Sequence, residues 1–131
     1  WANRIVLALG WLSVFASGLS TALVPPTTIT AVQHELVTLM WVILVTGASL
    51  PAAVGVLLGK NTLEGVAAWF ATAGIGAYTS SAWALVGVES VTRSTQAWAL
   101  TALVFFTFSR AMASAAHTYR VKRAVQRFTD R

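Results

Sequence analysis

Four long apolar stretches, separated by short polar connectors, constrain this chain more than any other feature of its sequence. They cover residues 5–24, 36–59, 66–88 and 97–116, and each has about the 20 residues with which an α-helix crosses a lipid bilayer. Little of the chain then remains for a domain outside the membrane. The sequence therefore predicts a single all-α membrane domain over residues 1–131, an integral membrane four-helix bundle with a basic amphipathic C-terminal extension.

Composition excludes an ordinary soluble domain of this size. Of the 131 residues, 56% are hydrophobic and only 10% are charged, whereas soluble domains carry about 25% charged residues. A bilayer removes this difficulty because lipid replaces water around most of the chain. The chain has no cysteine, so disulfides, thiolate chemistry and iron–sulfur ligation are excluded.

The first apolar stretch has two alternative interpretations, a retained helix or a secretory signal peptide. Residues 5–24 are longer than the usual apolar region of a signal peptide. The pair Pro25 and Pro26 that follows cannot continue a helix, and no clear small-residue cleavage pattern accompanies it. We therefore expect a retained membrane helix.

Basic residues cluster after the last apolar stretch, in the tail 117–131. They are Arg120, Lys122, Arg123, Arg127 and Arg131. A juxtamembrane basic cluster of this kind contacts anionic lipid headgroups, and we expect a lipid partner here and not nucleic acid. The helical spacing of apolar residues in the tail favours a position at the membrane surface. Arg4 and Lys60 fall on the same side, which predicts a multi-pass protein of the cytoplasmic (inner) membrane with both termini cytoplasmic.

Small residues at helical spacing are the strongest packing signal. Gly55 and Gly59 form a GxxxG pattern, which lets a second helix approach closely. Small residues continue this theme in the third and fourth stretches, at Ala68, Thr72, Gly76, Ser109, Ala113 and Ala116. Two interpretations stay open, packing within one bundle or association of several copies into a homo-oligomer.

Pro51 lies within the second stretch and is expected to kink its helix, because proline lacks the amide donor of the helical hydrogen bond. Such a break lines a binding site or pore in some membrane proteins. In others it is a structural bend whose freed groups are satisfied by neighbours. The sequence favours the structural bend.

Arg110 is the most informative charge, because a guanidinium within an apolar stretch costs several kcal/mol unless it pairs, snorkels or meets water. Glu64 begins the third stretch on the same predicted side of the membrane. Adjacent antiparallel helices would bring the two side chains together. The alternatives are a structural ion pair, Arg110 snorkelling alone, or a charge that lines or gates a pore.

Hydroxyl groups give the third and fourth stretches unusual polarity for membrane helices. Thr72, Thr79 and Thr107 are examples, and such groups either line a wet lumen or bond to backbone carbonyls and neighbouring helices. We favour the second use. His34 with Glu35 is the one adjacent pair of candidate metal or acid–base ligands, and no catalytic, metal or cofactor set can be assembled around it. An enzyme is not expected.

Two segments resemble small four-helix membrane proteins of actinobacterial phages, many of which are holins. One is LEGVAAWFATAGIGAYTSSAW, an acidic entry to a Gly/Ala-rich third helix, and the other is FSRAMASAAHTYRVKRAVQR, an arginine-bearing fourth helix that runs into a basic tail. The resemblance is one of layout across nearly the whole chain. It implies oligomerisation in the host cytoplasmic membrane and permeabilisation for lysis. Two other functions stay open: an accessory or assembly subunit of a larger membrane complex, and a small channel or transporter.

Overall fold

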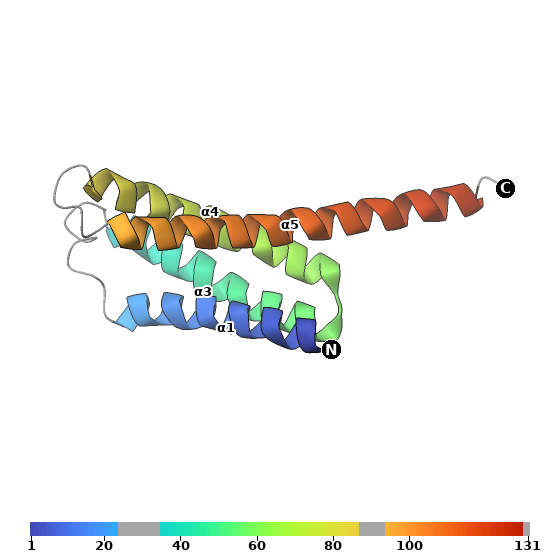
Figure 1. Ribbon diagram of the computed structural model, residues 1–131, viewed down its shortest axis with the longest axis horizontal. Coiled ribbons are helices and arrows are strands. Elements are labelled where there is room, and N and C mark those ends of the chain that lie inside the picture. The colour runs from blue at the N-terminus through green and yellow to red at the C-terminus, as the bar shows by residue number, and fades with distance from the viewer. Residues whose placement is uncertain (24–34, 87–93, 130–131) are drawn as a thin grey trace.

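A computed structural model describes residues 1–23, 35–86 and 94–129 of the chain, and all of its regular structure there is helical. In chain order the helices are α1 (Ala2–Leu23), α3 (Glu35–Leu58), α4 (Asn61–Val86) and α5 (Ser94–Thr129). They run up and down alongside one another, so that neighbours in the chain are antiparallel (Figure 1). The predicted all-α bundle is therefore confirmed.

The helices pack in chain order, α1 on α3, α3 on α4, and α4 on α5. A tilted ring contact between Trp11 of α1 and Phe106 of α5, with centroids 5.9 Å apart, also joins the first helix to the last. Helix α4 lies between two packing partners and buries residues along most of its length. Helix α1 packs mainly on one side, which leaves the rest of its surface exposed.

Three of the helices are long and apolar enough to cross a membrane. The apolar segments are Ala2–Leu23, Thr38–Leu58 and Ser94–Gln126. Helix α4, which contains residues 66–86 of the predicted third crossing 66–88, is not among these three segments, and it carries hydroxyl residues and Glu64. Its central position explains this difference, since its polar groups meet protein on two sides.

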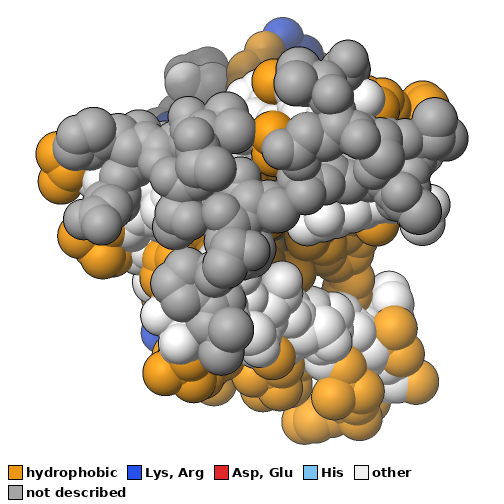
Figure 2. All heavy atoms as spheres, turned by 90° about the vertical axis from the view of Figure 1, so that its left-hand side faces the viewer, with side chains coloured by type: hydrophobic (Ala, Val, Ile, Leu, Met, Phe, Trp, Pro, Cys, Tyr) orange, Lys and Arg blue, Asp and Glu red, His pale blue; other side chains and the backbone are white. Residues whose placement is uncertain are grey.

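Side-chain size is distributed in an unusual way for a small bundle. Several of the fully buried residues are alanines, among them Ala52, Ala68, Ala71, Ala97 and Ala111. Large hydrophobic side chains such as Met40, Ile43, Phe70 and Phe105 are more than half exposed. Figure 2 shows hydrophobic side chains gathered on the flanks of the bundle. An exposed apolar surface of this extent around a small-residue core is typical of helices that pack within lipid.

The predicted fourth crossing and the predicted tail form one continuous helix. At 36 residues, α5 is about 54 Å long at 1.5 Å per residue, and its C-terminal part projects beyond the other helices (Figure 1). The structure continues the tail along the α5 axis, and the expected position of the tail at a membrane surface stays a prediction. The reason is local, because no proline or glycine follows Gly87 to break the helix between Ser94 and Thr129.

Some predictions fall outside the described residues. They are the two connectors at 24–34 and 87–93, His34, and the side chains of Glu35, Arg127 and Arg131.

Candidate functional site

The candidate site is an ion pair between α4 and α5. The guanidinium of Arg110 donates from Nη2 and Nε to one oxygen of Glu64, Oε1, over 2.7 and 2.8 Å. The Glu64 side chain is 3% exposed and that of Arg110 is 28% exposed. A buried carboxylate is costly without a partner, so Arg110 is what allows Glu64 to lie in the interior.

The turn between α3 and α4 places Glu64 at this position. Gly59 has a φ of 68°, the left-handed conformation that ends many helices and that glycine adopts without strain. The amide of Lys60 donates to the carbonyl of Gly55 over 2.8 Å, and that of Gly59 donates to Val56 over 3.2 Å. This pair of hydrogen bonds is a Schellman motif. It reverses the chain within two residues, so that Glu64 falls in the first turn of α4.

The structure separates the two glycines of the predicted GxxxG packing face. Gly55 is buried, and a Cβ atom there would lie 2.8 Å from the backbone nitrogen of Glu64. Gly59 lies beyond the end of α3, where a Cβ atom would approach the guanidinium of Arg4 at 3.1 Å. The prediction of one glycine face is therefore wrong: Gly55 serves helix packing inside the bundle, whereas Gly59 serves the turn.

Helices α4 and α5 also approach each other closely at Gly65, next to Glu64 in the chain. The hydroxyl of Ser114 donates to the backbone carbonyl of Asn61 in a short hydrogen bond. A Cβ atom added to Gly65 would lie 2.7 Å from the Cβ of Ser114. The close approach of the two helices thus requires glycine at position 65. The spacing of small residues in the sequence did not single out Gly65 as a packing residue.

Further polar contacts continue along the same pair of helices. The hydroxyl of Thr72 donates to that of Thr107 over 2.9 Å, and the indole of Trp83 donates to Thr101 over 3.0 Å. Near the other end, the amide of Gln96 donates to the hydroxyl of Tyr78 over 3.4 Å. Together these contacts define the α4–α5 polar interface, made of the pairs Asn61–Ser114, Glu64–Arg110, Thr72–Thr107, Tyr78–Gln96 and Trp83–Thr101.

Most hydroxyl groups of α4 and α5, including those of Thr72, Thr101 and Thr107, also donate to a carbonyl of their own helix. Thr79 donates to the carbonyl of Ile75 over 2.7 Å, Ser80 donates to Ala77 over 2.7 Å, and Ser109 donates to Phe106 over 2.8 Å. This is the use of hydroxyls that the sequence analysis favoured. In this conformation the serine and threonine hydroxyls named above are paired with one another or with backbone carbonyls.

The predicted packing residues fall into two groups. Ala68 is fully buried in the core. A Cβ atom at Gly76 would meet nothing within 4 Å, and both Ser109 and Ala113 are exposed. The face of α5 that packs on α4 carries Thr107, Ala111 and Ser114 instead.

The reason is helical geometry. Ser109 and Ala113 each lie two positions from Ala111, or about 200° around the helix at 3.6 residues per turn. Ser109 and Ala113 therefore lie on the opposite face of α5 from Ala111, and they point away from the bundle. If they pack against a helix, that helix is not one of the described helices of this chain.

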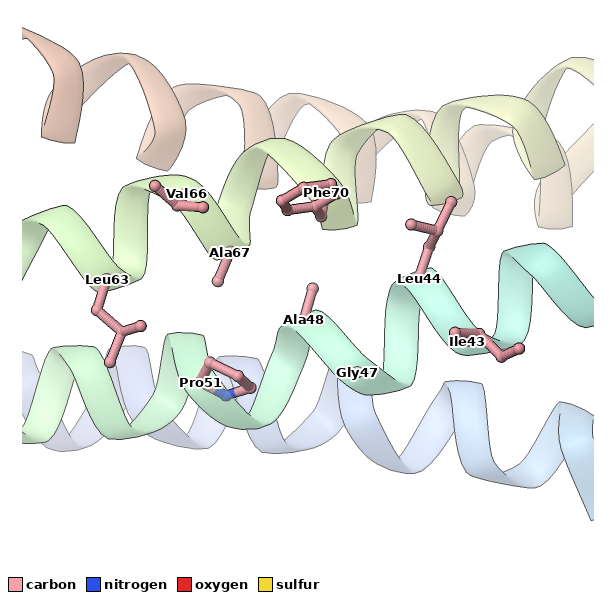
Figure 3. A pocket seen from close by; sticks show the side chains of 9 residues that line it. All are labelled: Ile43, Leu44, Gly47, Ala48, Pro51, Leu63, Val66, Ala67 and Phe70. Atoms are coloured by element: carbon pink, nitrogen blue, oxygen red, sulfur yellow. The ribbon is translucent and has the colours of Figure 1, made fainter.

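Pro51 lies inside α3 and faces α4 across an apolar groove of about 230 Å³. Leu63, Ala67 and Phe70 of α4 line the opposite side, and the two alanines Ala48 and Ala67 point toward one another (Figure 3). Because Pro51 has no amide hydrogen, the carbonyl of Gly47 lacks its usual helical donor. The groove lining holds no charged residue, and the kink expected at Pro51 stays a prediction.

The basic residues after Ala116 do not gather around the ion pair. His117, Arg120, Lys122 and Arg123 are exposed along the projecting part of α5, and the guanidinium carbon of Arg123 lies 4.6 Å from the centre of the Tyr119 ring. His117 lines one groove together with Gly59 and Lys60, which follow the C-terminal end of α3, whereas Glu35 begins that helix. Within the described residues, no three His, Cys, Asp or Glu side chains group as metal ligands would.

Comparison of the chain with protein-family models, with curated proteins and with solved structures gives no significant match.

Proposed function

We propose that this chain is a multi-pass protein of the cytoplasmic membrane, with both termini in the cytoplasm, that self-associates and permeabilises the membrane in the manner of a phage holin. Three apolar helices of crossing length and an apolar outer surface support insertion. Arg4, Lys60 and the basic part of α5 lie at one end of the bundle, which supports the orientation.

The observation that carries the proposal is the α4–α5 polar interface. It extends from Asn61 near one end of α4 to Trp83 near the other. As long as α4 and α5 stay together, these groups are paired with one another, and Glu64, Thr107 and Ser114 are buried. If the two helices separate, the same groups form a polar stripe along each helix that is costly in lipid and favourable in water. An assembly that brings several such stripes together lines an aqueous lesion.

Self-association has its own support in the exposed small residues. Ser109 and Ala113 lie on the outward face of α5, and α1 also exposes small residues, Ser13, Ala16, Ser17 and Ser20. Faces of this kind let helices of separate copies approach closely. The same α1 face also suits a partner helix from another protein, which is the basis of the alternative function as an accessory subunit.

A disulfide lock across the α4–α5 polar interface tests the proposal. The chain has no cysteine, so the variant Thr72→Cys/Thr107→Cys adds a single possible pair where the hydroxyls are 2.9 Å apart. In cells that express this variant, we expect oxidation to prevent collapse of the membrane potential and thiol reduction to restore it. The single variants Thr72→Cys and Thr107→Cys control for the oxidant.

Two outcomes would contradict the proposal. One is an intact membrane potential at high expression of the unmodified chain. The other is equal permeabilisation by the oxidised and reduced double variant, because the two helices would then have no need to separate. Affinity purification in mild detergent distinguishes the accessory subunit, which would bring down unrelated membrane proteins in fixed ratio in place of homo-oligomers.

A further inference from the structure

The end of the bundle that carries the α3–α4 turn holds two adjoining grooves outside the ion pair. The larger, of about 830 Å³, lies between this turn and the projecting part of α5. The smaller, of about 340 Å³, continues between α4 and α5. Four residues line both grooves, namely Thr62, Val66, Thr118 and Lys122. The two grooves thus form one continuous surface, which we call the α4–α5 end groove.

The two parts of the α4–α5 end groove differ in chemistry. The larger part is lined by the cationic side chains of Lys60 and Lys122 and by His117. The smaller part is walled by apolar side chains that include Val66, Trp69 and Ala115. No acidic residue lines either part among the described residues, and the nearby carboxylate of Glu64 is engaged by Arg110.

We propose that the α4–α5 end groove binds one anionic phospholipid, with its phosphate at Lys60 and Lys122 and an acyl chain along Val66, Trp69 and Ala115. Charge complementarity favours an anionic headgroup over a zwitterionic one. The apolar wall favours a lipid over free phosphate, which has no group to place there. The hydroxyls of Thr62 and Thr118 lie at the junction of the two parts, where the phosphate and ester oxygens of such a lipid would accept hydrogen bonds.

This inference rests on the membrane insertion proposed above, and it does not depend on permeabilisation. It goes beyond general attraction of a basic tail to a charged surface, because it assigns the binding to Lys60 and Lys122, from two different segments. It assigns no part to Arg120 or Arg123, which are equally basic and exposed but line neither groove.

Native mass spectrometry of the full chain in detergent tests this assignment, with phosphatidylglycerol and phosphatidylcholine of identical acyl chains as probes. We expect one phosphatidylglycerol to be retained preferentially. The variant Lys60→Gln/Lys122→Gln should weaken that binding about tenfold or more, whereas Arg120→Gln/Arg123→Gln, which removes the same charge, should leave it within about twofold.

A second pair of variants tests the apolar part without any change of charge. Ala115→Trp fills the wall of the smaller part and should also weaken phosphatidylglycerol binding. Ala116→Trp, one residue further along and outside the lining, should not. Inorganic phosphate at millimolar concentration should fail to compete.

Equal binding of the two lipids, equal losses in the two charge variants, or displacement by inorganic phosphate would each overturn the inference. Extraction of cell membranes with alkaline carbonate reports insertion separately. A chain that resists extraction but shows no lipid preference therefore contradicts the end groove alone, and a chain that is extracted contradicts the proposed membrane function.

Discussion

Arg110 Nη2 lies 2.7 Å from Glu64 Oε1, and the two side chains differ sharply in exposure, 28% for the arginine against 3% for the glutamate. This asymmetry has a consequence for the free energy of unfolding. When Arg110 is removed, the carboxylate stays buried without a counter-ion. When Glu64 is removed, the long arginine side chain can extend toward interfacial water.

We therefore expect Arg110→Leu to lower the free energy of unfolding by about 3 kcal/mol and Glu64→Leu by only about 1 kcal/mol. The double variant should return to within about 1 kcal/mol of the unmodified chain, because neither buried charge remains. Unfolding by sodium dodecyl sulfate in mixed micelles, followed by tryptophan fluorescence, measures all three. If the two single variants lose the same free energy of unfolding, the difference in exposure between Arg110 and Glu64 does not determine their contributions to stability.

The close approach at Gly65 predicts a strong contrast between two glycines of α4. Gly65→Ala should destabilise the bundle by about 2 kcal/mol, because the new methyl group overlaps Ser114. Adding Ser114→Gly should recover part of the loss. Gly76→Ala is the matched control: it meets nothing within 4 Å and should be neutral or stabilise by up to about 1 kcal/mol through helix propensity. The same unfolding assay applies, and a harmless Gly65→Ala would mean that α4 and α5 lie further apart.

The turn at Gly59 makes a prediction about backbone conformation. Gly59→Ala should cost about 1 kcal/mol, since an L-residue is strained at a φ of 68°. Gly59→Asn should cost less, because asparagine tolerates this region better. A Gly59→Ala variant as stable as the unmodified chain would indicate that Gly59 does not end α3 in the left-handed conformation.

The two faces of α5 predict opposite effects for two similar substitutions. Ala111 is fully buried, so Ala111→Leu should disturb folding of the single chain. Ala113 is exposed, so Ala113→Leu should leave the unfolding transition unchanged and weaken self-association roughly tenfold if that face joins copies of the chain. Fluorescence energy transfer between labelled copies in liposomes measures association. Unchanged energy transfer for Ala113→Leu would exclude this face as the contact.

The all-helical class and the approximate helix boundaries could be predicted because apolar runs of about 20 residues almost always form helices. The sequence allows the pairing of Arg110 with Glu64 as one of three alternatives, beside Arg110 snorkelling alone and Arg110 lining or gating a pore. The structure places them in contact.

Other features depended on rotation about helix axes, which composition does not reveal. Small residues occur on both faces of α5, so the spacing of Ser109 and Ala113 did not distinguish the inward face from the outward one. The GxxxG pattern failed for a related reason. The pattern assumes that both glycines are helical, whereas α3 ends at Leu58 and Gly59 lies in the turn that follows, with a φ of 68°. The five polar pairs between α4 and α5 could not all be predicted, because they depend on how far one helix is shifted and rotated against the other.

The continuity of α5 gives the protein a mechanical property. Arg110 and the projecting segment around Arg120 and Lys122 belong to one unbroken helix of 36 residues. A force on the projecting segment is therefore transmitted to the part of α5 that packs in the bundle. A protein or a lipid that tilts the outer arm applies torque to Thr107 and Arg110, against the bonds that hold them to α4. A force on the projecting segment thereby reaches Thr107 without a hinge, and a proline inserted near Thr118 would uncouple the two parts of α5.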